Sequence, residues 1–347
     1  MSAFDPPPKV TKQGTIIQAA PERPMVKVER GQIIGDTYRI DRFLGEGGMS
    51  TVLAATHLPS GRAVALKVLQ PDAAQEEGAI PRFWREVRAM THLQHPNVVR
   101  IFDVGSMPDG TPYMAMELLV GETLAARMRR LGPLPLPVAR GLFLQACDAV
   151  AAAHAIGVVH RDIKPENMFL TRGENGDEVL KVLDFGISKT MRATVADDRQ
   201  HLTKTTDVFG SPTYMSPEQL KASRDVDARA DVWSLGVLLY EMLAGTAPFE
   251  GRSVAEIFGA ILYKEPSPLG KTRTDIPPEI EKTVKRALEK DRDKRIRTVR
   301  ELRSSVAGAE GASTEAGRPG RARLLAGAGL LMLAAAMLAF LIARWLG

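Results

Sequence analysis

The feature that most constrains this chain is a pair of polar motifs near its middle. The first, His160-Arg-Asp-Ile-Lys-Pro-Glu-Asn167, places an Asp, a Lys and an Asn within six positions, and the second, Asp184-Phe-Gly186, begins seventeen residues after the first ends. Together they supply an acceptor for a hydroxyl proton, a cationic clamp for phosphate and hard oxygen ligands of the kind that Mg²⁺ prefers. The alternative is a polar loop followed by an accidental turn, so the interpretation depends on what accompanies the two motifs.

A glycine-rich segment precedes them in the chain. Leu44-Gly-Glu-Gly-Gly-Met-Ser-Thr-Val52 lies between two candidate strands, and its glycines let the backbone approach a phosphate closely. Taken alone, such a segment is also typical of a simple hairpin turn. Fifteen residues after Val52 comes Lys67, in Val64-Ala-Leu-Lys67, and a strand lysine there can reach the α- and β-phosphates of a nucleotide. Glu86, on a predicted helix, can pair with Lys67, although by itself it is an ordinary exposed helix charge.

Apolar patterning predicts a small β-rich part followed by a larger helical part. Between residues 37 and 120, Gly, Pro and Asp separate four strand-like runs and one helix, which are Tyr38–Leu44, Ala63–Leu69, Val98–Val104, Tyr113–Leu119 and the helix at about Ile80–Thr91. Residues 121–310 look mainly helical, with long Ala- and Leu-rich stretches at 137–156, 229–245, 253–263, 277–290 and 297–307. The sequence therefore predicts two lobes of different secondary structure.

Both ends of the chain differ from this folded part. Residues 1–35 are proline-containing and polar and predict a mobile arm, with a short strand at Gly14–Gln18. Without a signal-peptide core in this arm, we expect an amino terminus that is not exported. Residues 308–323 predict a linker, because Gly311–Gly320 is rich in small and polar residues.

A membrane span is predicted after the linker. Leu324–Ala343 contains 20 residues without a charge, which as a helix would be about 30 Å long, the thickness of a bilayer's hydrocarbon core. A buried or amphipathic helix is the alternative, but the run has no polar stripe. Three arginines precede the run and one follows it, so we expect a single-pass protein of the cytoplasmic membrane with its folded part in the cytoplasm. Only the tail 344–347 follows, and we expect no external sensor domain in this chain.

Charge and cysteine content exclude other classes of protein. The terminal segments 1–30 and 311–347 carry the whole formal excess of +5, and residues 31–310 have equal numbers of acidic and basic side chains. A basic face for nucleic acid is therefore not expected. The single cysteine, Cys147, excludes a disulfide framework and a four-cysteine zinc site, and we expect it to be a small buried group.

The ordered motifs resemble those of a known family. Over about residues 36–307 the sequence resembles the eukaryotic-like Ser/Thr protein kinases of bacteria, through the motifs above and three later features. These are Gly210-Ser-Pro-Thr-Tyr-Met-Ser-Pro-Glu218, Asp231 in Asp-Val-Trp-Ser-Leu-Gly236, and Arg295. The resemblance implies an α+β, bilobal protein kinase fold. Its β-rich N-lobe, with one key helix, would span about 36–119 and its helical C-lobe about 120–307.

The resemblance also implies roles for individual residues. Asp162 would orient the substrate hydroxyl and accept its proton, and Lys164 would neutralise charge on the γ-phosphate of ATP. Asn167 and Asp184 would bind Mg²⁺, with Mn²⁺ left open as an alternative. Met116 corresponds to the gatekeeper. The residues that would surround ATP or hold its phosphates are Leu44, Gly45, Glu46, Gly47, Gly48, Met49, Ser50, Thr51, Val52, Ala65, Lys67, Glu86, Met116, Glu117, Leu119, Phe169 and Asp184.

Substrate class and regulation follow from the same resemblance. Lys164, two positions after Asp162, is the Ser/Thr-kinase arrangement, and Thr213 matches the family threonine that bonds the catalytic Asp. Arg161 corresponds to an arginine that clamps a phosphate on the activation loop. Within that loop, roughly residues 187–211, Thr203 and Thr205, with Thr206 as the third choice, are candidates for autophosphorylation, or else ordinary polar loop residues. Ser50, Ser211 and Ser216 depart from the family pattern but are small, so we expect little loss of activity.

Several alternatives stay open at this point. The leading interpretation is a membrane-tethered kinase that uses ATP and protein substrates and binds no nucleic acid. A catalytically silent kinase fold that serves as a membrane scaffold is a second interpretation, and a small-molecule kinase is a third, disfavoured by the activation segment. Small residues in the apolar run, such as Gly327 and Gly329, would allow a homodimer through the spans, although bulk apolar sequence explains them too.

Overall fold

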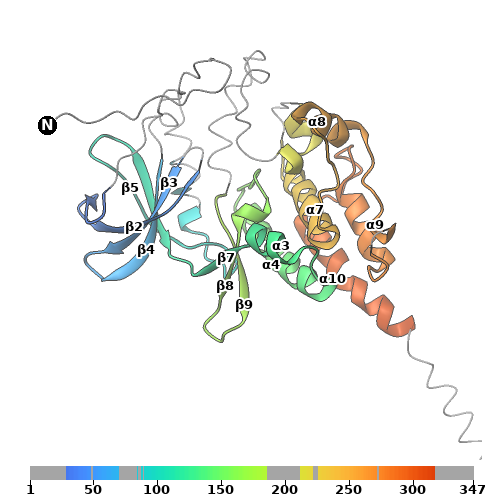
Figure 1. Ribbon diagram of the computed structural model, residues 1–347, viewed down its shortest axis with the longest axis horizontal. Coiled ribbons are helices and arrows are strands. Elements are labelled where there is room, and N and C mark those ends of the chain that lie inside the picture. The colour runs from blue at the N-terminus through green and yellow to red at the C-terminus, as the bar shows by residue number, and fades with distance from the viewer. Residues whose placement is uncertain are drawn as a thin grey trace, which may run out of the picture. The chain divides into compact units, whose positions relative to one another are not determined.

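The computed structural model describes residues 29–47, 50–69, 84, 87–88, 90–185, 212–221, 226–271 and 273–316 (Figure 1). These residues fall into two compact units. The first contains the described residues within 1–85 and 101–118, and the second contains those within 86–100 and 119–347. The predicted helix at Ile80–Thr91 is helical at every position that is described in it, namely residues 84, 87–88 and 90–91.

The first unit is a six-stranded antiparallel sheet with strand order β1-β2-β3-β4-β6-β5. Its strands are β1 Ile33–Ile34, β2 Tyr38–Gly47, β3 Ser50–His57, β4 Arg62–Leu69, β5 Ile101–Ser106 and β6 Pro112–Glu117. In β4, Val64, Leu66 and Val68 alternate along the strand and belong to the buried core cluster, and Ala65 and Leu69 on the opposite face are buried as well. The strand-rich part of the prediction is therefore confirmed, with β1 and β3 as additions.

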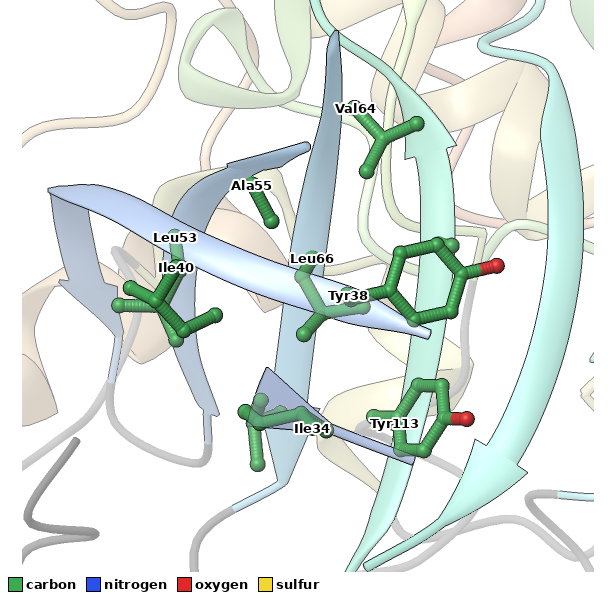
Figure 2. Close-up of a cluster of buried hydrophobic side chains, with 10 residues drawn as sticks. Ile34, Tyr38, Ile40, Leu53, Ala55, Val64, Leu66 and Tyr113 are labelled. Carbon is green, nitrogen blue, oxygen red and sulfur yellow. The ribbon is translucent and has the colours of Figure 1, made fainter. Parts of the chain in front are cut away.

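Tyr38 and Tyr113 are the largest side chains in the buried core cluster of this unit (Figure 2). The Tyr38 and Tyr113 rings meet edge to face with centroids 5.9 Å apart, and the Tyr38 hydroxyl donates to Asp103 Oδ2 at 2.9 Å. Burial, followed by the Asp103 carboxylate, raises the pKa of Tyr38 well above its usual range. A Cβ at Gly35 or Gly105 would lie 2.2 or 2.4 Å from the Tyr113 hydroxyl, so both positions must lack a side chain for this ring to fit.

The second unit is mainly helical. Its helices are α3 Leu124–Leu131, α4 Leu136–Ala155, α6 Pro217–Leu220, α7 Arg229–Ala244, α8 Val254–Tyr263, α9 Pro278–Ala287 and α10 Val299–Ala316. Figure 1 shows α7 at the centre of these helices. From Ala230 to Leu243 every residue of α7 except Glu241 is buried, and a helix that is apolar on all sides is typical of the centre of a core. The five predicted helices correspond to α4, α7, α8, α9 and α10.

For this unit, one expectation was incomplete and one was wrong. The region is mainly helical, as expected, but it also contains a three-stranded antiparallel sheet, formed by β7 Gly121–Thr123, β8 Met168–Arg172 and β9 Glu178–Val182. Its strands are too short for a periodic signal. In addition, α10 continues to Ala316, so residues 308–316 are helical where a linker was predicted. Alanines at 309, 312 and 316 favour the helix there.

One described helix, α4, is long and apolar enough to cross a membrane by length and composition alone. It belongs to the core of the second unit instead, since Ala139, Leu142 and Phe143 are buried and half of its most apolar stretch is covered by other residues. The predicted span Leu324–Ala343 and the predicted strand Gly14–Gln18 lie outside the described residues.

Candidate active site

The loop that carries Asp162 is fastened to the buried start of α7. Asp231, which is fully buried, accepts hydrogen bonds from the backbone amides of His160 and Arg161, each at 2.8 Å. Its Oδ2 also lies 2.7 Å from His154 Nε2, on α4. Two successive amides held by one carboxylate determine the path of the backbone just before Asp162. Arg161 has a left-handed φ of 61°, which costs energy in a non-glycine residue and persists only where its surroundings impose it.

His160 connects the two polar motifs. Its imidazole is fully buried, and burial lowers its pKa, so the ring is neutral at pH 7. Because Nε2 lies 3.0 Å from the Leu183 carbonyl and Nδ1 lies 3.3 Å from the Asp162 amide, Nε2 donates and Nδ1 accepts. The ring also packs on Phe185, with centroids 4.7 Å apart. One neutral histidine thereby holds the backbone on both sides of the site.

Asp162 is the centre of a cluster of polar side chains. Its Oδ2 lies 2.9 Å from Lys164 Nζ and accepts a hydrogen bond from Asn167 Nδ2 at 3.1 Å. Asn167 Nδ2 also donates to the Asp162 carbonyl at 2.8 Å. The side chains of Asp162 and Lys164 are only 15% and 18% exposed, so the charge of each is partly shielded from water. The three residues that the first motif supplies therefore meet in space.

Asn167 and Asp184 offer oxygen ligands in the same unit. The side-chain nitrogen of Asn167, Nδ2, is committed to Asp162. The side-chain oxygen of Asn167, Oδ1, is therefore the atom that would face a cation. The Leu183 amide donates to the backbone carbonyl of Asn167 at 2.8 Å, so the residue before Asp184 is bonded to this loop. Asp184 itself has a left-handed φ of 52°. Among the described residues, no three His, Cys, Asp or Glu side chains form a metal-binding group. A hard cation at this pair would prefer oxygen atoms, such as those of phosphate and water, as its remaining ligands.

The glycine-rich segment and Lys67 lie in the first unit. Gly45 pairs with Val52, Glu46 with Thr51 and Gly47 with Ser50, so the described residues of the segment form the paired ends of β2 and β3. Among the described residues, no atom would lie within 4 Å of a Cβ at Gly45, so packing against them does not explain this glycine, whereas room for a ligand would. Leu44 is partly exposed at the same hairpin.

On β4, Lys67 pairs with Val52 on one side and with Met114 of β6 on the other. Ala65, also on β4, pairs with Met116, and Val64 pairs with Glu117 at the end of β6. These neighbours bring the predicted nucleotide residues of the first unit onto one stretch of sheet. Leu119 follows β6 and belongs to the second unit, as does Phe169, which pairs with Thr123 and Lys181. Glu86, Gly48, Met49, Thr203, Thr205 and Thr206 lie outside the described residues.

The segment that ends in Ser-Pro-Glu is packed on α7. Thr213 and Tyr214 are buried, the Tyr214 carbonyl accepts from Ser234 Oγ at 2.8 Å, and the Tyr214 hydroxyl donates to the Glu241 carboxylate. Burial raises the pKa of Tyr214 and that of Glu241.

Glu218 in the same segment forms a bidentate pair with Arg295 at 2.7 and 3.0 Å. Burial alone would raise the pKa of Glu218, but the Arg295 guanidinium outweighs it and the pKa is lowered.

Sequence reasoning missed several residues that build this site. His154, Gln219, Tyr214 and Glu241 had no assigned role, and Asp231 and Arg295 were recognised only as parts of the family pattern. His154 and Asp231 are 77 positions apart and Glu218 and Arg295 also 77, so no local spacing could reveal these pairs. Only a knowledge of the tertiary structure connects them.

Comparisons with known proteins agree with this arrangement. A family model described as "Protein kinase domain" matches residues 38–305. The Ser/Thr-protein kinase pkn3 of Myxococcus xanthus is 38% identical over 263 residues, which cover 75% of this chain and 48% of pkn3. PknB of Mycolicibacterium smegmatis is 37% identical over 278 residues, which cover 79% of this chain and 43% of PknB. This chain thus spans less than half the length of these curated relatives.

The fold has a solved counterpart as well. The crystal structure of the Mycobacterium tuberculosis PknI kinase domain matches with a TM-score of 0.64 and 27% sequence identity, covering 82% of this chain and all of that one. Because the family model extends over most of the chain and the β-rich and helical units correspond to the two lobes of that fold, this chain belongs to the protein kinase family.

Proposed function

We propose that this chain is an ATP-dependent Ser/Thr protein kinase that transfers the γ-phosphate of ATP to Ser and Thr hydroxyls of proteins and is tethered to the cytoplasmic membrane by Leu324–Ala343. The observation that carries the proposal is the shared oxygen of Asp162. Its Oδ2 holds Lys164 Nζ at 2.9 Å and Asn167 Nδ2 at 3.1 Å. A proton acceptor, a cation for phosphate and a metal ligand thereby act as one group.

In the proposed reaction the substrate oxygen bonds to the γ-phosphorus, the bond from that phosphorus to the β–γ bridging oxygen breaks, and ADP leaves. Asp162 orients the attacking hydroxyl and accepts its proton, while Lys164 neutralises charge on the group being transferred. These side chains are already held by hydrogen bonds before substrate arrives. Most of the acceleration then comes from positioning and preorganised charge.

Nucleotide and metal binding complete the proposal. The glycine-rich segment and Lys67, paired with Glu86, would bind the phosphates, and Val52, Ala65 and Phe169 would enclose the adenine. Asn167 and Asp184 would hold Mg²⁺ or Mn²⁺, which neutralises phosphate charge when bound. Both residues offer oxygen ligands, which suit a hard cation that also binds phosphate and water.

The second candidate function is a catalytically silent scaffold with the same fold. Loss of Lys67, Asp162, Asn167 or Asp184 would favour it, and all four are present. The test is phosphate transfer from labelled ATP to a protein substrate by the wild-type chain and the variants Asp162→Asn and Lys67→Met.

We expect each variant to lose about 10²- to 10⁴-fold in rate, because Asp162→Asn removes the proton acceptor and Lys67→Met removes the cation that would hold the α- and β-phosphates. Asp177→Asn, an exposed turn residue, is the matched control and should keep the wild-type rate. Unchanged melting temperatures would show that the variants are folded. No transfer by the wild type, after phosphatase treatment and re-phosphorylation, would favour the scaffold.

Autophosphorylation belongs to the same proposal. Arg161 Nε is buried and has no hydrogen-bond partner among the described residues, and a phosphate on the activation loop would supply one. We expect phosphate on Thr203 and Thr205, with Thr206 next, and a rise in activity with it. Phosphopeptide mapping of the active enzyme tests this, and empty sites in fully active protein would refute it.

A further inference from the structure

Gln219, on α6, joins two segments that are distant in the sequence. Its Oε1 accepts from the Ser216 amide at 2.9 Å and lies 3.2 Å from Ser216 Oγ. Its Nε2 donates to the Arg161 carbonyl at 3.0 Å. The orientation of the amide follows from these partners, because exchanging its oxygen and nitrogen would set two donors against each other at the Ser216 amide and two acceptors at Arg161.

The carbonyl that Gln219 holds belongs to the peptide unit just before Asp162. Asp231 accepts a hydrogen bond from the Arg161 amide at 2.8 Å, and Gln219 donates one to the Arg161 carbonyl. Both backbone polar groups of Arg161 are therefore bonded to side chains. Between these two contacts Arg161 keeps its left-handed φ of 61°. A strained conformation of this kind needs surroundings that impose it, and Gln219 supplies the contact on the side that leads into Asp162.

Gln219 also belongs to the segment packed on α7. Ser216 caps α6, and Gln219 is the third helical residue in a reciprocal capping box with it. Residues 213–219 follow the activation loop, and Tyr214 and Glu218 anchor them to Glu241 and Arg295. The side-chain amide of Gln219 therefore connects this packed segment to the backbone of the loop that carries Asp162.

We propose that Gln219 is a positioning residue, which orients Asp162 by donating a hydrogen bond to the Arg161 carbonyl. The orientation of Asp162 then depends on how residues 213–219 pack on α7. The inference rests on the proposed kinase activity. Its alternative is that Gln219 only caps α6, in which case the bond to Arg161 is incidental.

Two variants separate these roles. Gln219→Glu keeps an oxygen for the Ser216 amide, since Glu is itself a capping-box residue, but turns a carboxylate oxygen toward the Arg161 carbonyl. Ser216→Ala does the reverse, because it removes the hydroxyl that caps α6 and leaves the Gln219–Arg161 bond possible. Gln219→Met removes the donor without adding charge and guards against an effect of charge alone.

The measurement is steady-state phosphorylation by the full-length chain in detergent, with kcat and KM determined for ATP and for a protein substrate. We expect Gln219→Glu to lower kcat at least about tenfold and Gln219→Met about three- to tenfold, with KM for ATP within twofold of wild type. Ser216→Ala should keep kcat within twofold and lower the melting temperature instead. A Gln219→Glu variant with wild-type kcat, or with a loss matched by Ser216→Ala, would overturn the proposal.

A second measurement does not depend on activity. Hydrogen exchange of peptides that cover residues 160–167 should be faster in Gln219→Glu than in wild type, and unchanged in peptides from β8 and β9. If the wild-type chain transferred no phosphate, the proposed function would fail, while the exchange rates would still report whether Gln219 holds this loop. Equal exchange in all variants would refute the positioning role.

Discussion

Lys290 is a cation in an unusually apolar place. Its Nζ lies 3.7 Å from the centroid of the Phe249 ring and 4.8 Å from that of Trp233, and it has no hydrogen-bond partner among the described residues. Burial lowers the pKa of Lys290 to about 8. The two rings attract the charged form, but they replace the water that would otherwise solvate it.

A pH dependence of stability follows. Between the folded pKa of about 8 and the usual value of 10.5, the unfolded chain binds more protons at Lys290 than the folded chain does, so stability rises with pH across this window. Urea unfolding at several pH values above 8 should show that the free energy of unfolding of the wild type rises with pH relative to that of Lys290→Met, which lacks this group. Parallel profiles for the two proteins would contradict it.

The buried pair of Glu218 and Arg295 leads to a second prediction at this scale. The Arg295 side chain is fully buried, and both of its terminal nitrogens bond the carboxylate. Arg295→Met should cost about 3–5 kcal/mol in the free energy of unfolding, because it leaves a buried carboxylate without its partner. The double variant Glu218→Leu/Arg295→Met should recover part of that loss. Urea unfolding checks both, and additive losses would show that the pair is not coupled.

Among the elements, the pairing of β7 with β8 depends on one glycine. Gly121 has a φ of 154°, and a Cβ there would lie 1.9 Å from the Leu170 carbonyl oxygen, which is backbone of the partner strand. Gly121→Ala should therefore disrupt this pairing and lower the urea midpoint. Gly141→Ala is the matched control, since Gly141 is exposed within α4 and its Cβ would meet nothing within 4 Å. It should stabilise the chain by about 0.5–1 kcal/mol. The same effect from both variants would contradict the clash.

Elements with long apolar runs could be predicted from the sequence, and short ones could not. β4 and α7 have runs of buried apolar residues that show a period or a length. By contrast, β7 has three residues and pairs with residues 169–171 across a long stretch of chain, so local pattern does not contain it. The linker prediction for residues 308–316 was wrong because their glycines and polar residues are typical of linkers and obscure the helix-favouring alanines between them.

The candidate site divides in the same way. Asp162, Lys164 and Asn167 lie within six positions, and their contacts could be anticipated from spacing and resemblance. The groups that hold them come from far along the chain, with 70 positions between Arg161 and Asp231 and 58 between Arg161 and Gln219. Such pairs arise from packing, which a single sequence does not display.

For the whole molecule, the test concerns attachment to a membrane. If Leu324–Ala343 spans the bilayer, the full-length chain should stay in the membrane pellet after alkaline carbonate extraction. A chain ending at Arg323 should be recovered in the supernatant with its transfer activity retained, because the described part of the kinase fold ends at Ala316. Recovery of the full-length chain in the supernatant would refute the span.

The continuation of α10 to Ala316 sets how far such an enzyme could reach. As helix, the nine residues 308–316 advance about 14 Å, whereas fully extended they would cover about 30 Å. Seven residues, 317–323, lie between Ala316 and Leu324, and they could span at most about 25 Å. Protein substrates in the cytosol would have to diffuse to within this distance of the membrane to be phosphorylated. An enzyme attached by so short a segment would favour substrates that are bound to the same region of the membrane.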